Sequence, residues 1–312
     1  MRKLITFAAC GALALGAAAC GEDDGSGGGG GGGGDLSGKI RIDGSSTVAP
    51  FAQAAAEDFQ GQNPGVKITV GTSGTGGGFE KFCAGETDIS DASRPIKDDE
   101  EVPICKKNGV TYKEVQVADD GIAVVTNPEL KVDCLTVEQL KKLWNEGSEV
   151  TKLSQIDPKL PDTELSLFGP GTDSGTFDFF TDAINGEEGV SRKDYQPSED
   201  DNVLVQGVEG EAGGLGYFGF SYYEQNQDKL NLVGVDDGSG CVKPATKPIQ
   251  SGEYKPLSRP LFMYPSEKAL KQPEVKAFMD YVVENYQPIA EASQIVPMNQ
   301  SQADEAKTAL GG

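Results

Sequence analysis

Three segments of the chain combine glycine with serine and threonine directly after an apolar run typical of a strand. They read DGSSTV at 43–48, GTSGTGGGF at 71–79 and GPGTDSGTF at 169–177. A helix pattern follows each one, so each turn would end where free backbone N–H groups and the positive end of a helix dipole meet. Glycine lets a ligand approach the backbone, and the hydroxyls add donors. The segments therefore predict an anion site that needs no lysine.

A fourth segment, TDISDASRP at 87–95, places a carboxylate near a guanidinium. Arg94 can donate two parallel N–H groups to a tetrahedral anion. Asp88 can only accept when ionised, so it disfavours an anion that carries no proton. Phosphate carries a proton at neutral pH and sulfate does not, so Asp88 predicts selection of phosphate. The alternative is a surface ion pair of little energetic weight.

Several catalytic motifs are missing from the sequence. No Gly-x4-Gly-Lys-Ser/Thr motif occurs, none of the three turns contains lysine, and the glycines at 74–78 lack dinucleotide-loop spacing. The chain has no histidine, which excludes a Ser-His-Asp hydrolase and removes the commonest zinc ligand. The cysteines show no C-x-x-C spacing. We expect no enzymatic activity, no metal and no cofactor.

The elements that position these turns alternate between strand and helix patterns, which is typical of an α/β fold with a mostly parallel sheet. In such a sheet the carboxyl ends of the strands share one edge, so the turns can converge there. The predicted strands are 39–43, 66–70, 115–126, 165–168, 215–220 and 261–264, and the predicted helices are 49–59, 79–84, 136–144, 176–184, 273–286 and a short one from 224.

The segments DGSSTVAP, SGTGGGFEKF, ETDISDASRP and GTDSGTFDFF resemble the signature segments of the phosphate-binding proteins of ABC transporters, the PstS family. The resemblance runs in the family's order from about residue 38 to the C-terminus. It implies a two-lobed periplasmic-binding-protein fold, type II-like, whose lobes are mostly parallel sheets flanked by helices. Inorganic phosphate would bind in the cleft between the lobes.

The same resemblance implies a set of ligand residues. Pro170 stands where another branch of the family has arginine, so Arg94 is expected to supply the guanidinium. The implied phosphate-binding residues are Ser46, Thr47, Ser73, Asp88, Arg94, Ser174, Gly175 and Thr176.

The order of the motifs predicts two lobes, with residues 36–125 and 259–312 in lobe 1 and residues 126–258 in lobe 2. Four cysteines lie in this region, and an even number in an exported chain suggests disulfides. Three pairings are open. We favour Cys83 with Cys105, which are close in sequence, and Cys134 with Cys241, which would close a long segment inside lobe 2. Neither bond would then hinder a hinge.

The N-terminus has the pattern of an export signal. Arg2 and Lys3 precede a short apolar run, which ends in small residues before Cys20. This resembles the lipobox of bacterial lipoproteins, so residues 1–20 are predicted to be a signal peptide and Cys20 the lipidated residue. A plain secretory signal is the alternative. Residues 21–35 are glycine-rich and predict a flexible tether at the extracytoplasmic face of the bacterial cell membrane.

The formal net charge of −22 disfavours nucleic acid and anionic membranes as partners. We expect a monomer that delivers phosphate to the permease subunits of an ABC transporter and touches the membrane only through its lipid. Three alternatives stay open. They are a binder of another oxyanion such as sulfate or molybdate, an exported phosphatase with a serine nucleophile, and a surface adhesin or sensor without a transport role.

Overall fold

The computed structural model describes residues 36–311, which belong to one compact unit, Asp35–Gly312. The predicted signal peptide, the lipidation at Cys20 and the tether lie outside the described residues. Among the described helices, none combines the length and the apolar composition that a membrane span requires.

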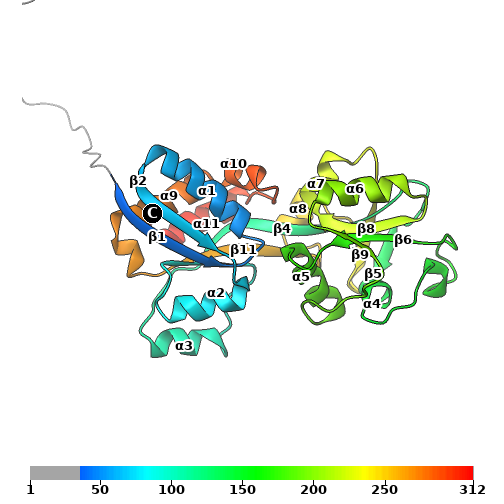
Figure 1. The fold of residues 1–312 in the computed structure, drawn as a ribbon, viewed down its shortest axis with the longest axis horizontal. Helices are drawn as coiled ribbons and strands as arrows, with labels where there is room; N and C mark the ends of the chain where they lie inside the picture. Colours follow the sequence, from blue (N-terminus) through cyan, green and yellow to red (C-terminus); the bar gives the residue numbers. More distant parts are fainter. Residues whose placement is uncertain (1–35, 312) are drawn as a thin grey trace, which may run out of the picture. The chain divides into compact units, whose positions relative to one another are not determined.

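The sheet has two halves, and the first half contains the N-terminal strand (Figure 1). Its strand order is β2 (Gly65–Gly71), β1 (Ser37–Gly44), β3 (Ile89–Ala92), β11 (Ser258–Pro265) and β4 (Val115–Thr126). β1 pairs with β2 and β3 in parallel, whereas β11 is antiparallel to both of its neighbours.

The second half of the sheet continues from the far end of β4. β8 (Gly214–Gly219), β6 (Ser166–Pro170) and β7 (Gln196–Ser198) follow in order, and β9 (Asn231–Asp236) joins β4 to β5 (Cys134–Thr136) and β10 (Cys241–Val242). β6 is parallel to β7 and β8, but β4 is antiparallel to β8 and β9. The α/β class is confirmed. The sheets are mixed rather than mostly parallel, because β4 and β11 run against their neighbours.

Helices cover both faces of each half (Figure 1). On the first half, one face carries α1 (Ala49–Gln62), α9 (Pro273–Glu284), α10 (Tyr286–Ala292) and α11 (Gln300–Leu310), and the other carries α2 (Gly74–Cys83) and α3 (Glu101–Lys107). On the second half are α4 (Val137–Trp144), α5 (Gly175–Phe180) with its π-helical continuation Thr181–Asn185, α6 (Asp201–Gly210), α7 (Phe220–Gln225) and α8 (Thr246–Gln250).

Two large hydrophobic cores correspond to the two halves. One surrounds Phe51 and Phe278, and the other surrounds Trp144 and Phe180. β4 contributes to both cores, because its first residues pack in one and its last residues in the other. The division into lobes at residues 125/126 and 258/259 stays a prediction, for which the two cores are the physical basis.

Both predicted disulfide pairings are confirmed. Cys83 is bonded to Cys105 and thereby joins the end of α2 to α3. Cys134 is bonded to Cys241 and joins β5 to β10. Each bond connects elements of a single half.

Helix α2 begins at Gly74, earlier than the predicted residue 79. Glycine has a poor helix propensity, so the sequence pattern alone favours a turn here. A Cβ on Gly78 would lie 2.5 Å from Cα of Gly44 on β1. Gly78 therefore lets α2 pack closely against β1, whereas a Cβ on Gly74 or Gly76 would meet no atom within 4 Å.

Candidate functional site

The three glycine-rich turns meet at one cavity of about 560 Å³. Ser46 and Thr47 reach it from the turn before α1, Ser73 from the start of α2, and Gly175 from the start of α5. The structure thus brings together turns that are far apart in the sequence, as their positions after β1, β2 and β6 predicted.

No side chain caps the first turn of α1 or α2. The residue that precedes α1 is Val48, which has no capping group. Ser73 precedes α2, but its hydroxyl donates to the carboxylate of Asp43 instead. The N–H groups of these turns are therefore free of side-chain acceptors at the cavity, an arrangement suited to an anion.

The turn before α5 faces the turn before α1 at close range. A Cβ on Gly175 would lie 2.3 Å from Oγ1 and 2.8 Å from the backbone nitrogen of Thr47. Only glycine fits there. Ser174 caps α5, because its hydroxyl accepts from the N–H of Thr176 at 3.2 Å. Neither Ser174 nor Thr176 is among the residues that line the cavity.

Arg259 also lines the cavity, and the sequence reasoning missed it. Its Nη2 donates to Oγ1 of Thr47 at 2.8 Å and to the carbonyl of Gly175 at 3.3 Å. Its Nε donates to Asp120 at 3.2 Å, and its guanidinium lies 3.8 Å from the ring centre of Phe179. The side chain is 16% exposed. This buried cation therefore contacts both halves of the structure.

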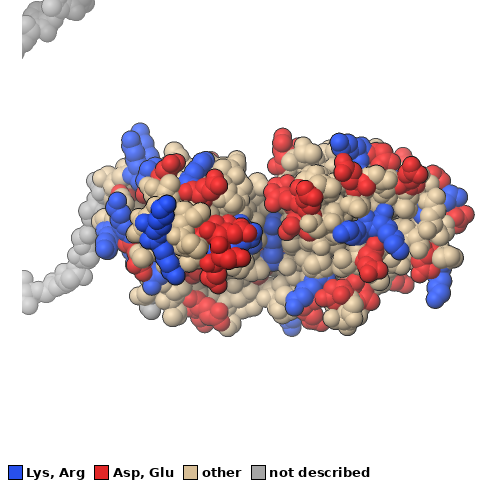
Figure 2. All heavy atoms as spheres, turned by 90° about the horizontal axis from the view of Figure 1, so that it is seen from below, with Lys and Arg blue, Asp and Glu red and all other residues tan. Residues whose placement is uncertain are grey.

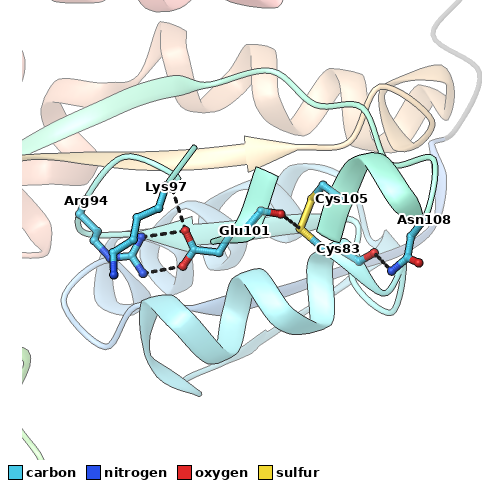
Figure 3. The surroundings of a disulfide bond; sticks show 6 residues. All are labelled: Cys83, Arg94, Lys97, Glu101, Cys105 and Asn108. Atoms are coloured by element: carbon cyan, nitrogen blue, oxygen red, sulfur yellow. Dashed lines mark hydrogen bonds and ion pairs between the residues drawn. A yellow bond between two sulfur atoms is a disulfide. The ribbon is translucent and has the colours of Figure 1, made fainter. Parts of the chain in front are cut away.

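Arg94 also lines the cavity, but part of its guanidinium is already engaged. Nη1 and Nη2 donate to the two carboxylate oxygens of Glu101 at 3.1 and 2.6 Å (Figure 3). The structure thus places Arg94 at the predicted site in the company of a carboxylate that the sequence analysis did not consider.

The position of Asp88 corrects the sequence analysis. Its Oδ2 accepts from the backbone and Nε of Arg41 at 2.9 and 3.1 Å, and its Oδ1 accepts from Nη2 at 3.1 Å. Asp88 does not line the cavity. Sheet pairing explains the difference, because β3 lies beside β1 and so presents Asp88 to Arg41. Asp88 does form an ion pair, as the alternative predicted, but its partner is Arg41 rather than Arg94.

Acidic side chains reach the cavity from α5 and the segment after it, namely Asp178, Asp182 and Glu188. Asp178 is partly buried. Burial and the nearby Glu188 raise its pKa, Arg259 opposes the shift, and the resulting pKa is about 6. The helical spacing of three residues from Gly175 could have indicated that Asp178 shares its face.

Lys97 and several hydroxyl groups that the sequence analysis did not single out also line the cavity. Thr75 and Ser93 are joined through their hydroxyls at 3.0 Å, and both line the cavity with Ser45. Among residues 36–311 no group of three or more metal-ligating side chains is placed to hold a metal ion.

The surface charge gives the site little long-range help. On the face drawn in Figure 2, acidic side chains lie over both halves, with basic side chains between them. Together with the net charge of −22, this means that an anion must be held by short-range contacts inside the cavity.

The chain matches a family model described as a PBP superfamily domain over residues 30–285. It is 47% identical over 266 residues to Protein SphX of Synechocystis sp., covering 84% of this chain and 79% of the relative. It is 41% identical over 276 residues to the phosphate-binding protein PstS of Staphylococcus saprophyticus, covering 88% and 84%.

Solved structures show the same fold. A crystal structure described as a possible phosphate binding protein from Planctomyces limnophilus has a TM-score of 0.83 and 45% identity, covering 88% of this chain and 98% of that chain. An ABC-type phosphate transport receptor from Vibrio cholerae has a TM-score of 0.67 at 20% identity, covering 82% and 99%. The predicted two-lobed fold is confirmed by this similarity.

Proposed function

The chain belongs to the PstS family of phosphate-binding proteins, and from this premise we propose that it captures inorganic phosphate outside the cell and delivers it to the permease subunits of an ABC importer. The family consists of transport solute-binding proteins and is not an enzyme family. The observation that carries the proposal is the cavity lined by Arg259 and by residues at the uncapped N-termini of α1 and α2.

In this proposal the donors come from both halves of the structure. Ser46 and Thr47 hold phosphate from one side, and the turn at 174–176 holds it from the other through its backbone. Ser73 would join them by exchanging its hydrogen bond to Asp43 for one to phosphate. Arg259 supplies the central positive charge, and Arg94 adds a second guanidinium at the cavity wall. Each charge-assisted bond is stronger than a neutral one, which compensates for the unfavourable net charge.

Asp178 takes over the selective role that was predicted for Asp88. It faces the cavity, and an ionised carboxylate can only accept a hydrogen bond. Monohydrogen phosphate can donate its proton to Asp178, whereas sulfate would bring an acceptor against an acceptor. Because the pKa of Asp178 is about 6, the group is mostly ionised at neutral pH.

Asp178→Asn is expected to give the protein measurable affinity for sulfate and to weaken phosphate binding by about tenfold, the cost of one hydrogen bond to a charged group. Titration calorimetry on phosphate-stripped protein at about pH 7.5 would measure both anions. The unaltered protein should bind one phosphate and give no sulfate heat. Absence of phosphate heat would overturn the proposed function.

Asp88→Asn is the matched control, since Asp88 lies outside the cavity and should not alter either titration. The unaltered protein offers a second check. Lowering the pH through about 6 protonates Asp178, so the exclusion of sulfate should fade towards about pH 5. Sulfate exclusion that persists in Asp178→Asn would refute the selective role.

We place the protein at the extracytoplasmic face of the membrane, anchored through Cys20 and monomeric. The two disulfides support an oxidising compartment. Replacement of Cys20 by serine should release the protein from the membrane fraction into the soluble fraction, because the thiol that carries the lipid is lost. Quantitative fractionation of both forms measures this. Retention of the serine variant in the membrane would argue against a lipid anchor.

A further inference from the structure

Glu101 holds one complete edge of the Arg94 guanidinium. The carboxylate lies at the start of α3, is 7% exposed, and accepts from Nη1 and Nη2 of Arg94 (Figure 3). It also accepts from the backbone N–H of Lys97 at 2.7 Å. Burial would raise the pKa of Glu101, but its bonds to Arg94 and Lys97 outweigh burial and lower it, so the pair is ionic.

The opposite edge of the same guanidinium remains unused. Nη1 donates its second hydrogen to the carbonyl of Pro95 at 3.1 Å. That leaves Nε–H and one hydrogen of Nη2 without a partner in the part of the chain that the structure describes. These two groups are parallel, and a pair of this kind matches two oxygens of a tetrahedral anion. Arg94 lines the cavity and its side chain is 33% exposed, so part of it is open to a ligand.

Helix α3, which carries Glu101, is bonded to neighbouring elements. Cys105 on α3 is bonded to Cys83 at the end of α2, and Asn108 after α3 donates to the carbonyl of Cys83 at 2.8 Å. On the other side, the loop after Arg94 is held by the hydroxyl of Tyr264, which accepts from the N–H of Ile96 at 3.0 Å. The disulfide and these hydrogen bonds therefore restrain the elements that carry Glu101 and Arg94 (Figure 3).

We propose that Glu101 is a positioning residue of the phosphate site, which turns the free edge of Arg94 towards the ligand, and that the Cys83–Cys105 disulfide fixes the helix that carries Glu101. The proposal rests on the proposed function, because it assumes that Arg94 contacts phosphate. The Glu101 carboxylate would then strengthen phosphate binding, whereas simple repulsion between like charges would weaken it.

The direction in which phosphate affinity changes when the charge of Glu101 is removed therefore separates positioning from repulsion. Glu101 repels a bound anion through its charge, but it also pre-orients the guanidinium and spares the ligand that ordering cost. If repulsion dominated, Glu101→Gln would tighten phosphate binding. If positioning dominates, the variant weakens it, because a glutamine amide presents donors to the donors of Arg94.

The experiment is a double-mutant cycle read by phosphate titration calorimetry. We expect Glu101→Gln and Arg94→Gln each to weaken phosphate binding about tenfold, and the double variant to bind no worse than Arg94→Gln alone. A merely structural role would reduce affinity equally in both backgrounds. Unchanged or tighter binding by Glu101→Gln would overturn the proposal, as would additive losses.

A second variant covers the case in which Glu101→Gln fails to fold. Replacing Cys83 and Cys105 with serine leaves Glu101 in place but loosens its helix, and should weaken phosphate binding several-fold only when Arg94 is present. The matched control replaces Cys134 and Cys241, which join β5 to β10 away from the cavity, and should leave the affinity unchanged.

Two failures can be told apart in these data. If the unaltered protein binds no phosphate, the proposed function fails. If it binds phosphate and Arg94→Gln binds equally well, only the role of the Arg94–Glu101 pair is refuted, and the phosphate-binding function stands.

Discussion

Arg259→Gln should weaken phosphate binding by about 100-fold or more, since removing one partner of a buried, hydrogen-bonded charge pair costs at least that much. Arg259 lines the cavity, and its Nη2 donates to Thr47 in the first half of the structure and to Gly175 in the second. Phosphate titration of the purified variant measures the loss. Arg259→Lys should recover only part of the affinity, because lysine keeps the charge but not the planar set of donors.

The control for this variant is Arg41→Gln. Arg41 also forms a carboxylate pair, with Asp88, but it lies outside the cavity. The phosphate affinity of the Arg41→Gln variant should stay unchanged. Because Arg259→Gln leaves Asp120 buried without its partner, the melting temperature of each variant must be recorded alongside. Equal phosphate affinity in the Arg259 variant and the unaltered protein would remove Arg259 from the site.

Gly175→Ala should reduce phosphate affinity by about tenfold to 100-fold, because forcing extra volume into a closely packed site costs about 1–3 kcal/mol. The added Cβ would lie 2.3 Å from Oγ1 of Thr47 and 2.9 Å from Oγ of Ser46. Both distances are below van der Waals contact, so the turns before α1 and α5 would have to move apart. The donors from the two halves could then no longer reach one small anion together. Titration calorimetry measures the affinity.

Small-angle scattering adds a structural readout for Gly175→Ala. The unaltered protein should show a phosphate-dependent change in scattering if the two halves close on the ligand, and Gly175→Ala should lack it. Gly61→Ala is the control, since a Cβ there meets no atom within 4 Å and the residue lies in α1 away from the cavity. Unimpaired phosphate binding by Gly175→Ala would show that the turns can separate without loss.

Local sequence order was sufficient to predict the three turns. Each follows a strand and precedes a helix, so its place at the strand edge depends only on neighbouring residues. Arg259 could not be found this way, because its partners Thr47 and Gly175 are far from it in sequence. Asp88 was misassigned for a related reason: its partner Arg41 is set by the pairing of β3 with β1.

The fold was predictable to a similar extent. β4 has the predicted bounds, and α4 starts after Thr136, whose hydroxyl accepts from Gln139 as a helix cap. The short strands β5, β7 and β10 were missed, since two or three residues carry no periodicity. The antiparallel direction of β11 was not predicted either, because an apolar run does not indicate which strand it pairs with.

Arg259 lies on β11, which pairs along its length with β4, and β4 in turn belongs to both cores. In the proposed phosphate site, this positive charge is therefore carried by a strand that connects the two halves, rather than by a loop of either one. If phosphate binding changes the geometry of β4 and β11, the relative orientation of the two halves would change with it. A permease could then distinguish the loaded from the empty protein without contacting the anion.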